Sequence, residues 1–248
     1  MQGGTAHHLS LDSAVAALPQ NDRLDNFSRV VNPASILPTM TTRFDDLLCL
    51  AESAMSPSPD LQSKFMEFMV AHNRPRMDGF EKWIFHPGML FHALEKWWGD
   101  QGQRPAPHEG LDLYRFADAG GITKTVDKNT QTPAAFAGHV VKIHRDFLGK
   151  SIYMSHAIFA SGGRQLISAF GHTVPRDSLK IGRYVAEGEI IAAISGFPGK
   201  QTNLLPHLHL TFAWAPVDVS PAQLTWENLG NDPGIMLIDP LAVISKLL

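Results

Sequence analysis

The sequence predicts a mainly β protein, in which an antiparallel β-sandwich or barrel-like domain follows a partly helical N-terminal region. From about His108 onward, short runs of alternating apolar and polar residues recur, which is typical of half-buried strands. Glycine-containing turns such as Gly162-Gly163 and Glu187-Gly188 separate these runs. The first hundred residues instead carry apolar side chains at helical spacing. Together these observations predict a β domain placed after a helical segment.

Two helices are expected in the N-terminal region, over residues 43–54 and 60–72. In each, apolar side chains recur at intervals of three and four residues, as on one face of a helix. The segment Ser56-Pro57-Ser58-Pro59 separates them, and Ser58 is the expected N-cap of the second helix. The run Asn73-Arg74-Pro75 is expected to end that helix.

Residues 83–98 are rich in aromatic side chains, which we expect to pack in the core or between domains. A carbohydrate-binding strip at Trp97-Trp98 is the alternative interpretation. A short helix is expected at the C-terminal end, over residues 240–248. The predicted domain organisation is an N-terminal region at 1–100, a β domain at 101–220 and a C-terminal extension at 221–248.

Six strands are expected in the β domain. In order, they cover residues 138–143, 151–156, 165–170, 184–186, 189–194 and 207–214. In the last strand His207 and His209 share one face, because residues i and i+2 of a strand point the same way. The opposite face, which begins with Leu208 and Leu210, is apolar and is expected to join the core. The histidine face must therefore line a polar site.

Composition excludes several classes of protein. Of the 248 residues, 44% are hydrophobic and 18% are charged, which is an ordinary balance for a globular fold. The net charge of −3 and the lack of a basic run argue against a dedicated nucleic-acid-binding surface. No apolar stretch approaches the roughly 20 residues that span a bilayer. The single cysteine, Cys49, lies in an apolar run, so we expect a small buried side chain and no intramolecular disulfide.

The N-terminal sequence lacks the basic region and the long apolar core of an intact signal peptide. Two locations are left open by this pattern: the cytoplasm, or the outside of the cell after removal of a leader. His7-His8 lies in this polar segment and is expected to be solvated.

Two histidine-containing motifs indicate a metal centre. The first is His108-Glu109-Gly110-Leu111-Asp112, and the second, about a hundred residues later, is Pro206-His207-Leu208-His209. Zinc is bound by imidazole nitrogen and carboxylate oxygen, and a catalytic site uses three protein ligands and keeps one position for water. The adjacent histidines of the second motif could both bind metal, or one could bind while the other transfers a proton. A hydrolytic zinc site is the first interpretation.

From about residue 104 to 214 the chain resembles the lysostaphin-type, LytM-like zinc endopeptidases. His108–Leu113 is similar to their H-x-G-x-D-apolar motif, and Pro206–Leu210 is similar to P-H-L-H-F. The intervening matches, in order, are Ala137–Val141, Ser151–Ala157, Phe170-Gly171-His172 and the glycine hairpin from Leu179 to Ile191.

This resemblance implies an antiparallel β peptidase domain and a role for each matched residue. It implies that His108, Asp112 and His209 bind Zn²⁺ and that His172 and His207 are catalytic histidines outside the ligand set. The implied reaction is endopeptidase cleavage in peptidoglycan cross-links or stem peptides, or in a related glycine-rich peptide. The implied location is the bacterial cell envelope or the outside of the cell.

Other histidines are interpreted as structural or surface residues. His156 matches a position that is often histidine in the family, but it is not among the five implied site residues. Apart from the resemblance, nothing ranks His172 above His139, His144 or His156.

The sequence departs from the family pattern at positions that are expected to shape the substrate-binding groove and not at the implied metal ligands. Asn203-Leu204-Leu205 precedes the second motif where the family often has a small residue and glycine. Leu210-Thr211 follows His209 where the family often has phenylalanine and then a polar or acidic residue, and Thr173 replaces a leucine. A non-catalytic LytM-like binding or regulatory module of the cell envelope is the alternative; some members of the fold have lost ligands and act in this way, but all five positions are filled here. A lipoyl-carrier-like sandwich is a third reading, but the hairpin around Glu187-Gly188 lacks a lysine at its tip.

Overall fold

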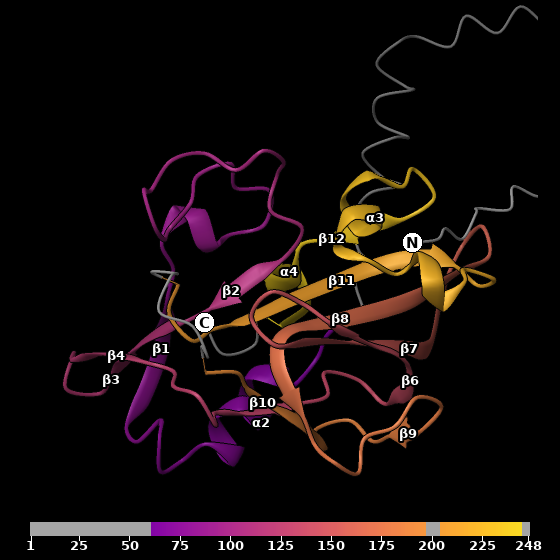
Figure 1. Cartoon of the computed structure of the whole chain (residues 1–248). Helices are drawn as coiled ribbons and strands as arrows, with labels where there is room; N and C mark the ends of the chain where they lie inside the picture. Colours follow the sequence, from indigo (N-terminus) through magenta and orange to yellow (C-terminus); the bar gives the residue numbers. More distant parts are fainter. Residues whose placement is uncertain (1–60, 197–203, 245–248) are drawn as a thin grey trace, which may run out of the picture. The chain divides into compact units, whose positions relative to one another are not determined.

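The computed structural model describes residues 61–196 and 204–244 (Figure 1). The expected helix at 43–54, the expected N-cap Ser58, Cys49 and His7-His8 lie outside the described residues. The described part contains twelve strands, β1 to β12, and only short helices.

The strands have the following bounds: β1 Phe80–Ile84, β2 Leu111–Leu113, β3 Arg115–Asp118, β4 Thr123–Thr125, β5 Gln131–Pro133, β6 Gly138–Arg145, β7 Lys150–Ala160, β8 Arg164–Pro175, β9 Tyr184–Val185, β10 Ile190–Ile194, β11 Leu208–Pro216 and β12 Met236–Ile238. The helical elements are α2 Phe65–His72, α3 Trp226–Asn231, α4 Pro240–Ile244 and the 3-10 turns η1 Pro87–Met89 and η2 Pro221–Gln223. Each of the six predicted strands has a counterpart, and the predicted C-terminal helix corresponds to α4 within the described residues. The short strands β1 to β5 and β12 were not predicted.

Helix α2 begins at Phe65 and not at residue 60 as predicted. The preceding residues make contacts with distant parts of the chain instead. The Ser63 hydroxyl donates to the Ala135 carbonyl at 2.6 Å, and the Ser63 backbone N–H donates to the Val243 carbonyl at 2.8 Å. Because these long-range contacts hold Ser63 outside the helix, tertiary structure overrides the helical pattern of Leu61 and its neighbours.

Two antiparallel sheets make up the described fold. A nine-stranded sheet has the order β12-β11-β8-β7-β6-β9, with β2 also paired to β11 and β10 paired to both β8 and β5. A three-stranded sheet has the order β1-β3-β4. Strand β8 pairs along its length first with β7 and β11 and at its end with β10, and Figure 1 shows it curving between these partners. The predicted mainly β, antiparallel fold class is confirmed.

Strand β11 has the alternation expected from the sequence. Its residues Leu208, Leu210, Phe212 and Trp214 belong to the main apolar core cluster. Ala213 and Ala215 point the other way and belong to a second, smaller cluster. His209 and Thr211 share that second face, so the strand presents its polar residues away from the main core.

The main core cluster joins segments from both sides of the predicted domain limits. It contains Leu61 and Phe65 of the N-terminal region, many residues of the β domain, and Val243 and Ile244 of the C-terminal extension. The aromatic side chains of Trp83 and Trp97 are buried in it, as expected for core packing. The boundaries at residues 100 and 220 stay a prediction.

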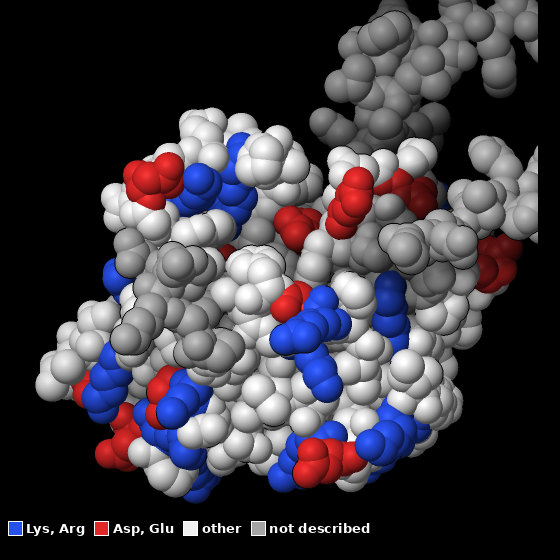
Figure 2. Space-filling view, viewed as in Figure 1, with Lys and Arg blue, Asp and Glu red and all other residues white. Residues whose placement is uncertain are grey.

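Surface charge is mixed on the face shown in Figure 2, where Lys and Arg residues are interspersed with Asp and Glu. A separate property concerns membranes: none of the helices among the described residues is long and apolar enough to cross one.

Candidate metal centre

Two imidazoles and one carboxylate converge at one point of the fold. His108, Asp112 and His209 each offer one ligand atom, and these atoms lie within 4.8 Å of one another. The His108 Nε2 atom is 3.1 Å from His209 Nδ1 and 3.3 Å from Asp112 Oδ1. The His209 Nδ1 atom is 2.9 Å from Asp112 Oδ1. All three side chains are buried.

Strand pairing explains this convergence. Strand β2 is antiparallel to β11, and their register places Asp112 directly opposite His209. Opposite residues of an antiparallel pair project from the same face at short distance, so the carboxylate and the imidazole meet. His108 lies just before β2, where its backbone N–H donates to the Ala93 carbonyl and its carbonyl accepts from the His92 N–H.

Each candidate ligand also has an outer hydrogen-bond partner. His108 Nδ1 donates to the Leu90 carbonyl at 2.9 Å, which leaves the lone pair of Nε2 directed at the cluster. His209 Nε2 lies 3.1 Å from the Thr211 hydroxyl, which can accept its N–H and so leave the Nδ1 lone pair free. The Trp97 indole N–H donates to Asp112 Oδ2 at 2.6 Å. Such partners fix the tautomer and orientation of a metal ligand.

The charge balance of the cluster favours an ionised Asp112. Burial alone would raise the pKa of this carboxyl, but charge interaction with His108 and His207 and hydrogen bonds from His108 and His209 hold it well below its ordinary value. The Arg104 guanidinium is a further charged neighbour, with its Nη2 atom 3.6 Å from Asp112 Oδ2. Burial lowers the pKa of His209 despite its hydrogen bond with Asp112, and this favours the neutral, metal-binding form.

The donor set fits zinc. Zinc–nitrogen and zinc–oxygen bonds of about 2.0–2.2 Å at tetrahedral angles require ligand atoms about 3.3 Å apart. The three separations of 2.9, 3.1 and 3.3 Å lie within a few tenths of an ångström of that value. In the tautomers that leave His108 Nε2 and His209 Nδ1 unprotonated, a cation between the three atoms could be bound by all of them.

Two further histidines lie beside the cluster. His207 Nδ1 donates to the Leu205 carbonyl at 2.8 Å, and its Nε2 is 3.8 Å from Asp112 Oδ1. The His172 ring centroid is 4.8 Å from that of His207 and 5.9 Å from that of His209. Burial lowers the pKa of His207 to about 4, although the Asp112 charge opposes this shift. The sequence motifs therefore select five side chains that the fold brings together.

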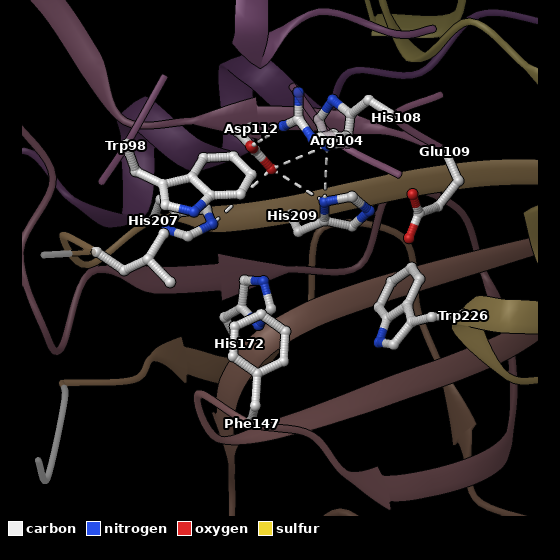
Figure 3. Close-up of a pocket in the computed structure, with 11 residues that line it drawn as sticks. Trp98, Arg104, His108, Glu109, Asp112, Phe147, His172, His207, His209 and Trp226 are labelled. Atoms are coloured by element: carbon white, nitrogen blue, oxygen red, sulfur yellow. Dashed lines mark hydrogen bonds and ion pairs between the residues drawn. The ribbon is translucent and has the colours of Figure 1, made fainter. Parts of the chain in front are cut away.

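A cavity of about 290 Å³ opens over these histidines. Figure 3 shows Trp98 beside His207 and Trp226 beside Glu109, with Phe147 next to His172. Phe147 remains 74% exposed although it packs against the His172 ring at 5.2 Å between centroids. The cavity walls are therefore largely aromatic, whereas its floor is formed by the histidines and Asp112.

Gly171 explains how β8 leaves room for this arrangement. It lies opposite His209 in the β8–β11 pair. A Cβ atom on Gly171 would lie 2.9 Å from the Trp226 ring and 3.3 Å from His209 Cβ, so a larger residue would displace one of them. The Trp226 ring instead packs edge-on against the His209 ring at 4.6 Å between centroids.

The remaining histidines of the β domain stand apart from the cavity. His139 and His144 are exposed, in agreement with their interpretation as surface residues. His156 is fully buried, where its Nδ1 donates to the Ala137 carbonyl at 3.0 Å and its Nε2 lies 2.8 Å from the Ser168 hydroxyl. Its position is structural, as the sequence interpretation expected.

His156 predicts a pH dependence of stability. Burial lowers its pKa to about 4 from the ordinary 6.5, against a smaller opposing effect of the hydrogen bond to Ala137. Below pH 6.5 the unfolded chain therefore binds a proton that the folded chain rejects. We expect the contribution of neutral His156 to the free energy of unfolding to be complete above pH 6.5. As the pH falls toward 4, this contribution should be lost, and the free energy of unfolding should decrease by about 3 kcal/mol in total.

The measurement is urea unfolding at several pH values between 4 and 7, with a chelator present in all samples. The variant His156→Gln should show a shallower decline of the unfolding free energy than the parent chain over this interval. His139→Gln, at an exposed position, serves as the control and should follow the parent. Equal slopes for His156→Gln and the parent would contradict the assignment.

Comparisons with known proteins find matches among solved structures alone. No protein-family model and no curated protein matches the sequence. The solved structures that match include the catalytic domain of the antimicrobial peptidase lysostaphin from Staphylococcus simulans, at 17% identity and a TM-score of 0.33, over 66% of this chain and 86% of that one. LytU matches at 22% identity and a TM-score of 0.38, over 64% of this chain and 81% of that one.

The catalytic domain of the prophage-encoded M23 protein EnpA from Enterococcus faecalis matches at 18% identity and a TM-score of 0.32, over 59% of this chain and 97% of that one.

Proposed function

We propose that this protein is a zinc-dependent endopeptidase that hydrolyses peptide bonds in peptidoglycan cross-links or stem peptides. The observation that carries the proposal is the convergence of His108, Asp112 and His209 under an open cavity, with two more histidines beside them. The peptidoglycan substrate is inferred from the family motifs in the sequence. With that substrate, the protein would work in the bacterial cell envelope or outside the cell.

The proposed ligands of zinc are His108 Nε2, Asp112 Oδ1 and His209 Nδ1. When bound, zinc supplies a Lewis acid that lowers the pKa of water and polarises a carbonyl group. The protein's part is to hold these three atoms in place through the Leu90 carbonyl, the Trp97 indole and the Thr211 hydroxyl.

The proposed catalytic histidines are His207 and His172. Because His207 Nδ1 donates to the Leu205 carbonyl, its Nε2 lone pair is available to accept a proton from an attacking water molecule. His172 lies across the cavity floor at 4.8 Å between ring centroids, where it can act on the same reacting groups. One of the two transfers the proton, and the other donates a hydrogen bond to the developing oxyanion.

The aromatic walls provide the binding surface for the peptide. Trp98, Phe147 and Trp226 surround the polar floor, and their apolar faces exclude water from the groups that react. Phe147 is exposed enough to contact substrate directly. We expect Phe147→Ala to raise KM about tenfold while the zinc content is unchanged, because it removes a binding contact and no ligand. Steady-state kinetics of peptide hydrolysis checks this, and an unchanged KM would exclude Phe147 from substrate contact.

The test of the proposed function uses the purified full chain, metal analysis and digestion of purified cell-wall sacculi, with product masses as the readout. We expect about one zinc ion per chain and the release of peptide fragments. His207→Ala and His172→Ala should keep zinc but lose hydrolysis at least about 100-fold, since removing a general acid–base group costs that much. His144→Ala, at an exposed position, should retain full activity.

Two outcomes would contradict the proposal. A folded His207→Ala variant with undiminished hydrolysis would remove that histidine from the mechanism. A folded parent chain that binds zinc and leaves every sacculus intact would favour the alternative, a non-catalytic module of the cell envelope.

A further inference from the structure

Asp146 is a buried acid that the sequence motifs do not contain. It lies in the turn between β6 and β7, where its Oδ1 accepts the Leu148 backbone N–H at 2.8 Å. Its own backbone N–H donates to the Gly149 carbonyl at 3.1 Å. The side chain is only 2% exposed. The turn therefore holds this carboxylate in one orientation, with Oδ2 directed away from the turn.

Oδ2 of Asp146 contacts His172 at two places. It accepts the His172 backbone N–H at 3.0 Å and lies 3.4 Å from the His172 ring atom Nδ1. That ring nitrogen is buried, and in the described residues it has no aligned hydrogen-bond partner. The Asp146 carboxylate thus lies within ion-pair distance of this buried ring nitrogen of His172.

The backbone of His172 adopts an unusual conformation at this point. Its φ angle of 62° lies in the left-handed region, which costs a non-glycine residue about 1–2 kcal/mol. The N–H of His172 is bound by Asp146, and its carbonyl accepts the Ser195 N–H at 2.8 Å. These two hydrogen bonds hold the strained residue from both sides, so the ring position depends on Asp146.

Ser151 connects the same carboxylate to the cavity wall. Its hydroxyl donates to Asp146 Oδ2 at 2.7 Å and accepts the Trp226 indole N–H at 3.0 Å. Burial alone would raise the pKa of Asp146, but its interactions with His172 and the hydrogen bond from Ser151 hold it below the ordinary value, so the group is ionised at neutral pH.

We infer that Asp146 is a positioning residue for His172: it fixes the backbone of that histidine and holds the proton on Nδ1, so that Nε2 serves the reaction. The inference rests on the proposed function for the catalytic part of its test. A carboxylate that orients a catalytic imidazole and selects its tautomer is a known arrangement in hydrolytic enzymes of other folds.

The first measurement needs no activity. Nitrogen-15 NMR of the imidazole groups at pH 8, in the zinc-free chain, reports which ring nitrogen carries the proton, and His172→Gln assigns the signal. We expect the parent chain to show His172 protonated on Nδ1. In Asp146→Asn, which keeps the shape of the side chain and the acceptor for the Leu148 N–H, we expect the signal to shift toward the Nε2-protonated tautomer. If His172 of the parent chain carries its proton on Nε2, the inference is overturned. This result does not depend on whether the variant folds.

The second measurement is peptide hydrolysis by the zinc-loaded enzyme. Asp146→Asn should lower kcat by about 10²- to 10⁴-fold with little change in KM, because the group acts on His172 and touches no substrate. Asp177→Asn is the matched control, because it makes the same change at an exposed position. It should keep the parent tautomer and a kcat within about threefold.

The outcomes separate the two proposals. A parent chain with the Nδ1 tautomer and no hydrolysis would refute the proposed function and leave Asp146 as the group that sets the His172 tautomer. An active parent whose tautomer and kcat are the same in Asp146→Asn would refute the inference about Asp146 and leave the proposed function standing.

Discussion

Asp112→Asn is expected to abolish zinc binding at micromolar concentrations and to weaken the zinc-free fold as well. The substitution keeps the shape of the side chain but removes the negative charge and one lone-pair donor from the ligand set. Changes in outer-shell partners alone typically cost 10- to 100-fold in metal affinity, so loss of a direct ligand should cost at least about 100-fold. Competition with a chromophoric chelator measures this loss.

The effect on the zinc-free fold has a separate cause. The Arg104 side chain is only 8% exposed, and its nearest carboxylate is that of Asp112 at 3.6 Å. Removing one partner of a buried charge pair leaves the other without compensation, which typically costs 3–5 kcal/mol. We expect urea unfolding in excess chelator to show a loss of about 3 kcal/mol.

A control substitution at the surface separates these two effects from the effect of removing any carboxylate from the protein. Asp100 is 73% exposed and pairs with Lys96 at 3.2 Å, so Asp100→Asn should change neither zinc affinity nor stability measurably. In the parent chain, added zinc should raise the unfolding temperature, whereas in Asp112→Asn it should not. An Asp112→Asn variant that binds zinc as tightly as the parent would exclude this carboxylate from the ligand set.

The sequence could predict the ligand set because the chemistry lies in two compact motifs. Alternation in the last strand separates His209 from Leu208 and Leu210, and this separation depends only on the period of two that every strand has. The structure adds the pairing of β2 with β11, which places Asp112 opposite His209. The strand β2 has three residues, too few for a periodic pattern, and it exists because β11 is its partner.

The groups that orient the candidate ligands could not be predicted in the same way. The Trp97 side chain lies in a segment that the sequence shows only as aromatic, and its hydrogen bond to Asp112 depends on where the chain turns after η1. The Leu90 carbonyl that accepts from His108 belongs to the backbone, which carries no sequence signal. In the sequence Thr211 belongs only to a departure from a family pattern, whereas in the structure its hydroxyl contacts His209 Nε2.

Asp146 shows a further limit of the sequence. An aspartate in a turn between two strands is ordinarily a turn residue, and Asp146 does accept the Leu148 N–H in that way. Its second oxygen reaches His172, 26 positions later, only because β7 and β8 are paired and return the chain to the same end of the sheet. A pattern that is local in the sequence cannot contain such a contact.

Gly110→Ala is expected to disrupt the metal centre although it changes no ligand. Gly110 lies between His108 and Asp112, and a Cβ atom there would meet three groups of β11 at once. It would lie 2.5 Å from the Thr211 hydroxyl oxygen and 2.7 Å from His209 Nε2, and it would also overlap the Leu210 carbonyl oxygen. Real Cβ atoms do not approach this closely, so β2 would have to move away from β11.

The movement would separate Asp112 from His209 and displace the Thr211 hydroxyl from its imidazole. Overpacking of a core typically costs 1–3 kcal/mol, and here backbone atoms that cannot rotate away are among those displaced, so we expect a loss of about 3 kcal/mol in urea unfolding. We also expect zinc affinity to fall at least tenfold in the chelator competition. Gly230→Ala is the matched control, because a Cβ there meets no described atom within 4 Å and helix α3 favours alanine over glycine. If Gly110→Ala binds zinc and unfolds as the parent does, the close approach of β2 to β11 does not build the site, and the glycine of the H-x-G-x-D motif needs another explanation.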